Sequence, residues 1–218
     1  MKILFVFAHP DDEAYGPAGT INKLAQSHEV EIFVLCRGDR FGNEDVSRAR
    51  IEQFKQSCEH LGVKGTILNH SDCNLTYNQV CSDITKKVMQ FEPDVVYTHS
   101  NTDIHLDHRL VSEATMVACR PTANSTVNAV YMCEIPSSTD WSFGKINGSF
   151  TPNVYKDVTD FIHKKQQVMS LYKTELHDYP DARSTESMEV LAMHRGKQIG
   201  VHRAEAFQLV FSHDRGIQ

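Results

Sequence analysis

The chain has 218 residues, of which 40% are hydrophobic and 23% are charged, a composition typical of a globular protein. Lysine and arginine number 22 against 28 aspartates and glutamates, so the formal net charge is −6 at pH 7. This balance, without any basic block, argues against nucleic acid or an anionic membrane surface as a partner and favours a small or neutral substrate.

Targeting signals and the cysteine pattern indicate where the protein is located and which metal ligands it can offer. No apolar segment approaches the roughly 20 residues that span a bilayer, and Met1-Lys2 leads directly into an apolar run and not into a signal peptide. We therefore expect a soluble, cytoplasmic protein without membrane insertion. Six scattered cysteines without a C-x-x-C pair predict buried free thiols, so a bound metal would take nitrogen and oxygen ligands.

Strands and helices are predicted to alternate along residues 1–135. Apolar runs predict strands at 2–7, 29–35, 65–69, 94–99 and 129–135, and apolar residues at helical spacing predict helices at 21–28, 51–61, 81–91 and 105–118. Gly62 and Pro93 mark the ends of the second and third helices. This order predicts an α/β fold with a Rossmann-like, doubly wound and mostly parallel sheet that carries helices on both faces.

Residues 136–218 have a less regular pattern. They predict a turn region at 141–144, an extended segment at 152–155, a helix containing Phe161, Val168 and Tyr172, a short helix near 186–193 and a last strand at 206–211. Because no linker or repeat interrupts the chain, we expect one domain, 1–218, in which these elements complete the sheet and wall the site. The sequence does not determine the oligomeric state, and a homo-oligomer is compatible with it.

An acidic motif, residues 8–13 (AHPDDE), follows the first predicted strand. A strand buried on both faces would place His9, Asp11 and Asp12 at its C-terminal end, where open α/β sheets bind their ligands. Taken alone, two aspartates at this point fit a helix N-cap at least as well. A second polar motif, residues 105–108 (HLDH), follows the fourth predicted strand and favours the functional interpretation.

Sheet topology connects the two motifs. In the common strand order 3-2-1-4-5, strands one and four are neighbours whose crossovers leave on opposite faces, so a crevice opens at their C-terminal ends. The two motifs are therefore expected to converge. Two or three imidazoles with a carboxylate suit zinc with a bound water, and also iron, cobalt, manganese or nickel. A metal-activated water beside a second carboxylate predicts amide or ester hydrolysis.

At these two motifs the sequence resembles the PIG-L/LmbE family of metal-dependent deacetylases, which remove acetyl groups from N-acetylglucosamine derivatives. The resemblance extends over nearly the whole chain through weaker matches at 61–63, 93–99, 183–184, 195–196 and 204–207. It implies that His9, Asp12 and His108 hold the metal, usually zinc. It also implies that Asp11 is the general base and that His105 stabilises the intermediate, with Asp107 behind it.

Two positions depart from the family pattern. Gln53 stands where the second helix of relatives often has Glu, and Asp181 stands where relatives often have His. These differences leave the exact acetylated substrate open.

Further residues are candidate substrate ligands, but each also has a purely structural explanation. Arg50 and Arg37 are candidate substrate ligands, as is Asp103, but surface ion pairs or a loop cap explain them equally well. His99 ends the fourth strand and fits a buried, hydrogen-bonded histidine or a support for the site. Glu13 has no assigned role.

Two functions remain from different classes. The motifs favour a zinc-type N-deacetylase, and the Rossmann-like order alone would also fit a noncatalytic nucleotide- or sugar-binding module. The second alternative is weaker because residues 16–19 (GPAG) are not a G-x-G-x-x-G fingerprint and because the acidic loop would repel a pyrophosphate.

Overall fold

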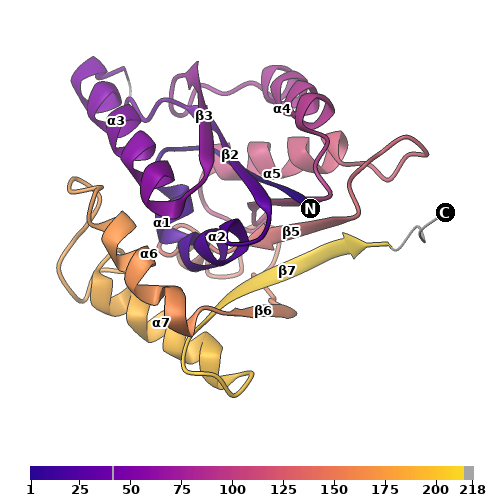
Figure 1. Ribbon diagram of the computed structural model, residues 1–218. Coiled ribbons are helices and arrows are strands. Elements are labelled where there is room, and N and C mark those ends of the chain that lie inside the picture. The colour runs from indigo at the N-terminus through magenta and orange to yellow at the C-terminus, as the bar shows by residue number, and fades with distance from the viewer. Residues whose placement is uncertain (41, 214–218) are drawn as a thin grey trace.

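The structure, a computed structural model, describes residues 1–40 and 42–213. A seven-stranded sheet with the order β3-β2-β1-β4-β5-β7-β6 runs through it (Figure 1). Five strands are mutually parallel: β1 (Lys2–Phe7), β2 (Glu29–Cys36), β3 (Lys64–His70), β4 (Val95–His99) and β5 (Ala129–Cys133). β7 (Ala204–Ser212) is antiparallel to both of its neighbours, β5 and β6 (Val154–Asp157). The predicted Rossmann-like, mostly parallel sheet is confirmed.

Helices cover both faces of this sheet because β1 is apolar on both sides. Ile3, Phe5 and Phe7 belong to one core, whereas Leu4 and Val6 belong to the other. The first core is covered by α1 (Asp12–Tyr15), α2 (Ala18–Ala25), α3 (Glu44–Leu61), α6 (Ile162–Met169) and α7 (Thr185–Lys197). The second is covered by α4 (Tyr77–Phe91) and α5 (Leu106–Ala118), on the other side of the sheet (Figure 1).

Several helix boundaries differ from the prediction. The helix predicted at 21–28 lies three residues earlier, as α2, and Gly16 and Pro17 separate it from the short helix α1. α3 begins at Glu44 and not at residue 51. α6 ends at Met169, and Tyr172 lies in the turn that follows it, although its side chain is fully buried. Tyr172 fitted the apolar pattern because its side chain is buried, although its backbone is not helical.

A buried carboxylate of β7 joins the C-terminal elements to the start of α2. Lys165 of α6 lies 2.8 Å from the carboxylate of Glu205 in β7. That carboxylate also accepts hydrogen bonds from the backbone N–H groups of Gly19 and Thr20, at 3.1 and 2.7 Å, in the first turn of α2. The loop that follows residues 8–13 is therefore held in place by a strand near the other end of the chain.

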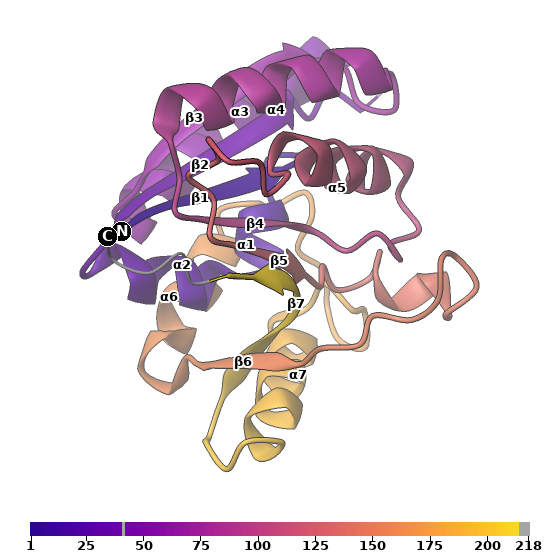
Figure 2. The ribbon, with the colours of Figure 1, turned by 90° about the vertical axis from the view of Figure 1, so that its right-hand side faces the viewer.

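Figure 2 shows this part of the molecule from the side, with β6, β7 and α7 at the opposite end of the sheet from β3. Within the described residues, each helix is too short or too polar to cross a lipid bilayer.

Candidate active site

The two sequence motifs meet at the C-terminal edge of the sheet. β1 and β4 pair directly, with Ile3 opposite Val95 and Phe5 opposite Tyr97, so the loop after β1 lies beside the first turn of α5. His9, Asp11, His105 and His108 line a cavity of about 200 Å³. Asp12 and Asp107 are buried beside these residues, each 1% exposed or less.

Three donor groups converge at the centre of the site. His9 Nδ1 lies 3.2 Å from His108 Nε2, which lies 3.3 Å from Asp12 Oδ1. The other oxygen of Asp12 is 3.7 Å from His9 Nδ1. Ligand atoms about 2.0–2.1 Å from a tetrahedral zinc ion are roughly 3.3 Å apart. The spacing of these three side chains therefore suits a divalent metal ion.

The other nitrogen of each imidazole is held by a buried carboxylate. Asp107 Oδ2 lies 3.0 Å from His9 Nε2, and Asp103 Oδ2 lies 3.1 Å from His108 Nδ1. A carboxylate behind a histidine fixes the tautomer and directs the free lone pair toward a metal. Asp12 Oδ1 accepts no hydrogen bond from the described residues although it is buried. The donor set, the orientation of the imidazoles and this oxygen without a hydrogen bond are all compatible with a divalent metal.

These contacts correct two expectations. Asp107 was expected behind His105, but its carboxylate contacts His9, and only its backbone N–H reaches His105, donating to Nδ1 at 3.2 Å. Asp103 was expected as a candidate substrate ligand, but it is fully buried. Its carboxylate is occupied by His108 and by the hydroxyls of Ser138 and Thr139, at 2.9 and 3.0 Å. The Asp103 carboxylate therefore faces His108 from behind and not the cavity.

The pKa values of the adjacent carboxylates Asp11 and Asp12 are shifted in opposite directions. Burial raises the pKa of Asp11, and the guanidiniums of Arg50 and Arg183 only partly oppose this. Burial acts on Asp12 in the same direction, but there the imidazoles of His108 and His99 outweigh it and hold the pKa well below the ordinary value. Asp12 is therefore a permanent anion, whereas Asp11 is closer to the range in which a carboxylate exchanges protons.

The histidines are also divided by their surroundings. Burial and the neighbouring His9 and His108 lower the pKa of His105 to about 3, so this imidazole is neutral. Burial opposes the charged form of His108 too, but Asp12 and Asp103 outweigh it and raise the pKa to about 10. A metal at His108 Nε2 would have to displace a proton.

His99 lies behind the site and does not face the cavity. Its Nε2 accepts the Ala8 N–H at 2.9 Å and lies 3.3 Å from Asp12 Oδ2. Its ring is stacked on His108 with the centroids 3.9 Å apart. The interpretation of His99 as a buried, hydrogen-bonded histidine is thus confirmed, and its contacts with Asp12 and His108 place it directly behind the cavity.

The structure separates the two candidate arginines. Arg50, on α3, lines the cavity and contacts Asp11 Oδ2 at 3.3 Å and the Pro10 carbonyl at 3.2 Å. Arg37 points elsewhere and forms ion pairs with the buried Asp39 and the exposed Glu44, at 3.0 and 2.9 Å. Arg37 does not line the cavity, so the structure favours the ion-pair interpretation for this residue.

Two carboxylates at the cavity wall, Asp72 and Glu175, were missed by the sequence analysis. Glu175 comes from the irregular segment between α6 and α7 and is only 5% exposed. It pairs with Arg40 and Arg50, and with Arg183 at 3.1 Å. No motif surrounds Glu175, and the only sequence signal nearby was the weak family match at Arg183-Ser184.

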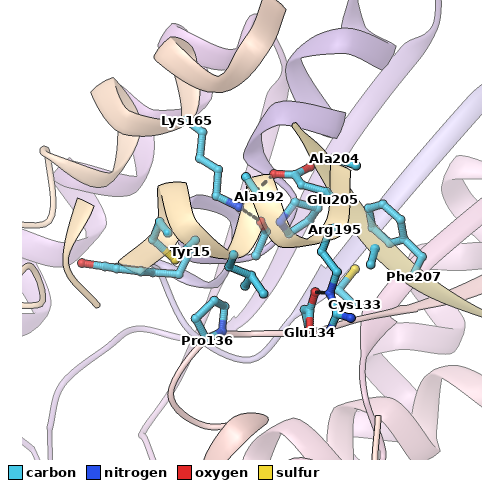
Figure 3. A pocket seen from close by; sticks show the side chains of 15 residues that line it. Tyr15, Cys133, Glu134, Pro136, Lys165, Ala192, Arg195, Ala204, Glu205 and Phe207 are labelled. Atoms are coloured by element: carbon cyan, nitrogen blue, oxygen red, sulfur yellow. Dashed lines mark hydrogen bonds and ion pairs between the residues drawn. The ribbon is translucent and has the colours of Figure 1, made fainter. Parts of the chain in front are cut away.

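A second cavity lies between α7 and β7 (Figure 3). Two ion pairs lie at its wall, Lys165 with Glu205 and Arg195 with Glu134. Its volume of about 20 Å³ admits roughly one water molecule. This small space lies in the packing that joins the C-terminal elements to the sheet.

Fold and site together define a hydrolase centre at the edge of a parallel sheet. The PIG-L family, described as GlcNAc-PI de-N-acetylase, matches residues 4–119. This range contains both motifs, residues 8–13 and 105–108. An uncharacterized deacetylase of Escherichia coli K12, YaiS, is 31% identical over 166 residues, covering 72% of this chain and 82% of the relative. The chain therefore belongs to the PIG-L family and is an enzyme of the deacetylase class, which excludes a purely noncatalytic binding module.

Longer matches extend the comparison to nearly the whole chain. Diacetylchitobiose deacetylase of Thermococcus kodakarensis is 26% identical over 228 residues, covering 96% of this chain and 83% of the relative. The structure of N,N'-diacetylchitobiose deacetylase from Pyrococcus horikoshii superposes with a TM-score of 0.79 at 22% identity, covering 96% and 83% of the two chains.

The same fold also occurs in an enzyme with a different reaction. GalB, the 4-carboxy-2-hydroxymuconate hydratase of Pseudomonas putida KT2440, superposes with a TM-score of 0.80 at 19% identity, covering 100% of this chain and 99% of that chain. At such identities the structures show a shared fold alone. The reaction has to be argued from the site.

Proposed function

We propose that this protein is a zinc-type N-deacetylase that removes the acetyl group from an N-acetylated amino sugar, an N-acetylglucosamine conjugate or a similar small amide. The observation that carries the proposal is the paired arrangement of the two imidazoles. Asp107 and Asp103 engage the outer nitrogens of His9 and His108, so the inner nitrogens converge with Asp12. The relatives named for diacetylchitobiose support the amino-sugar substrate.

His9 Nδ1, His108 Nε2 and the Asp12 carboxylate would hold the ion. Nitrogen and oxygen donors in this ratio suit Zn²⁺ and are also accepted by Fe²⁺, Co²⁺, Mn²⁺ and Ni²⁺. When bound, such an ion polarises a carbonyl group and lowers the pKa of water to about 7.

Asp11 is positioned to move the proton. Its carboxylate lines the cavity beside the metal ligands, and its elevated pKa reduces the difference from neutral pH that a general base has to overcome. Arg50 and Arg183 contact the same carboxylate oxygen, at 3.3 and 3.1 Å, and keep it oriented. Asp11 then takes a proton from the attacking water and returns it to the departing amine nitrogen.

His105 is positioned to stabilise the negative charge on the substrate oxygen. Its Nδ1 accepts the N–H of Asp107 at the start of α5, so the neutral ring carries its proton on Nε2. That N–H can donate a hydrogen bond to an oxyanion in the cavity. The backbone at the start of α5 thus provides the orientation that the Asp107 carboxylate was expected to supply.

Acetate release tests the proposal. The purified protein, loaded in turn with Zn²⁺, Fe²⁺ and Co²⁺, is incubated with N-acetylglucosamine, diacetylchitobiose and glycosides of N-acetylglucosamine. We expect stoichiometric acetate and free amine from at least one substrate. A protein that binds metal but releases no acetate from any of these compounds would contradict the proposed reaction.

A further inference from the structure

The proposed base, Asp11, has an unusual backbone conformation. Its φ is 129° and its ψ is −22°. Residues other than glycine rarely adopt this region of the backbone. Its carbonyl accepts hydrogen bonds from Ala14 and Tyr15, at 2.9 and 3.0 Å, and thereby starts α1. Strained backbone at a functional site persists only where the surroundings hold it in place.

The side chain of Glu13 holds the other side of the same residue. Its Oε2 accepts the backbone N–H of Asp11 at 3.1 Å. Its Oε1 accepts hydrogen bonds from the hydroxyls of Ser57 on α3, at 2.6 Å, and of Tyr172 after α6, at 2.5 Å. Glu13 is fully buried, so two separate elements anchor a carboxylate whose remaining oxygen is directed at the Asp11 peptide.

This arrangement solves a geometrical problem in the active site. Asp11 and Asp12 are adjacent, yet one carboxylate lines the cavity beside two arginines while the other lies among His9, His99 and His108. The positive φ at Asp11 is the point where the chain turns between these two directions. If the Asp11 N–H lost its acceptor, the strained conformation would lose the contact that holds the N-terminal side of this residue.

We propose that Glu13 is a positioning residue that keeps the Asp11 peptide at positive φ and thereby directs the Asp11 carboxylate into the cavity. The inference rests on the proposed function, in which Asp11 is the base. Glu13 acts through Asp11 and touches no substrate. Ser57 and Tyr172 hold Glu13 in turn, so the orientation of the base depends on α3 and on the turn after α6.

Three variants test this role at a temperature at which all of them are folded. Glu13→Ala removes the acceptor, and we expect kcat to fall about 10- to 100-fold with KM and zinc content close to wild type. Glu13→Gln retains a carbonyl oxygen that can accept the Asp11 N–H, and should restore most of kcat. Tyr172→Phe loosens only the Oε1 side; it should lower the melting temperature but retain kcat within about threefold.

A double substitution separates positioning from general damage. In an Asp11→Asn background, Glu13→Ala should cause no further loss of kcat, because the residue through which it acts is already disabled. An additive loss, or equal losses of kcat in Glu13→Ala and Tyr172→Phe, would show a purely structural role and overturn the inference.

A crystal structure of Glu13→Ala gives a readout without turnover. We expect φ of Asp11 to become negative and the carboxylate to leave the cavity. An Asp11 that keeps positive φ in this variant would overturn the inference even if the enzyme is an active deacetylase. Conversely, a relaxed Asp11 in a protein that releases no acetate would leave the positioning role intact and refute the proposed reaction.

Discussion

The two parts of the chain contribute to the site in different ways. Residues 1–135 supply all the proposed metal ligands and the proposed base, at the C-terminal ends of β1 and β4, where parallel topology directs loops to a common edge. Residues 136–213 complete the cavity wall through Ser138, Glu175 and Arg183. Loops at the ends of ordered strands carry the reactive groups, and irregular segments far along the chain supply part of what surrounds them.

The largest expected effect tests whether the N-terminal part alone carries the chemistry. Asp11→Asn should lower kcat about 10²- to 10⁴-fold while zinc remains bound, because only the proton acceptor is removed. Asp12→Ala should instead lose the metal. Acetate release and metal analysis of both variants check this division of roles. Full activity in Asp11→Asn would show that the base has been assigned wrongly.

The next effect tests the connection between the two parts. Glu205→Ala should destabilise the protein by about 3–5 kcal/mol, because it leaves Lys165 buried without its partner. Denaturant unfolding measures the change, and Glu205→Gln, which keeps the size of the side chain and an acceptor for the α2 N–H groups, is the matched control. Equal stability of Glu205→Ala and wild type would mean that the C-terminal strand is not needed to hold the N-terminal loop.

A smaller effect depends on pH. Burial raises the pKa of Glu13 to about 7, above its ordinary value of 4.5. The folded state therefore retains a proton that the unfolded state has lost. The corresponding stability is fully present below about pH 4.5 and is lost as pH rises through 7, a difference of about 3 kcal/mol.

Glu13→Gln has no proton to lose at this position, so it is the control for that measurement. Urea unfolding of wild type and variant from pH 4.5 to 8.5, at equal metal content, should give curves that diverge as pH rises, with the wild type losing more stability. Parallel curves would show that Glu13 is ionised over the whole range.

The smallest expected effect concerns the two arginines. Arg50→Ala should raise KM and disturb Asp11, since its guanidinium lines the cavity. Arg37→Ala should leave KM and kcat within about twofold of wild type, as expected for a surface ion pair. Steady-state kinetics on both variants checks this, and a large rise in KM for Arg37→Ala would restore it as a substrate ligand.

Much of the fold was predictable because the pattern and the topology agree. The strand at 2–7 is apolar at every position from Ile3 to Phe7, which is typical of a strand buried on both faces, and Gly62 ends α3 at a positive φ of 75° as predicted. The neighbouring positions of β1 and β4 followed from the common doubly wound order. These features depend on local sequence and on a small set of allowed connections.

What escaped prediction depends on where side chains point. Arg37 and Arg50 look alike in sequence, but Arg37 pairs with Asp39 and Glu44 outside the cavity, whereas Arg50 faces the cavity from α3. Asp103 precedes the second motif as a substrate ligand would, yet it is buried behind His108. Glu175 reaches the cavity from a segment without periodicity, so no local pattern could connect it with Arg50.

The hydrogen bond from Gly19 to Glu205 joins residues 186 positions apart. Contacts of such long range close late in folding, because the chain entropy lost in closing the loop is not compensated until most other elements are in place. All the proposed metal ligands are synthesised by position 108, but the loop that follows two of them is fastened only when β7 docks. We therefore expect a refolding chain to acquire its helices and strands before it acquires tight metal affinity.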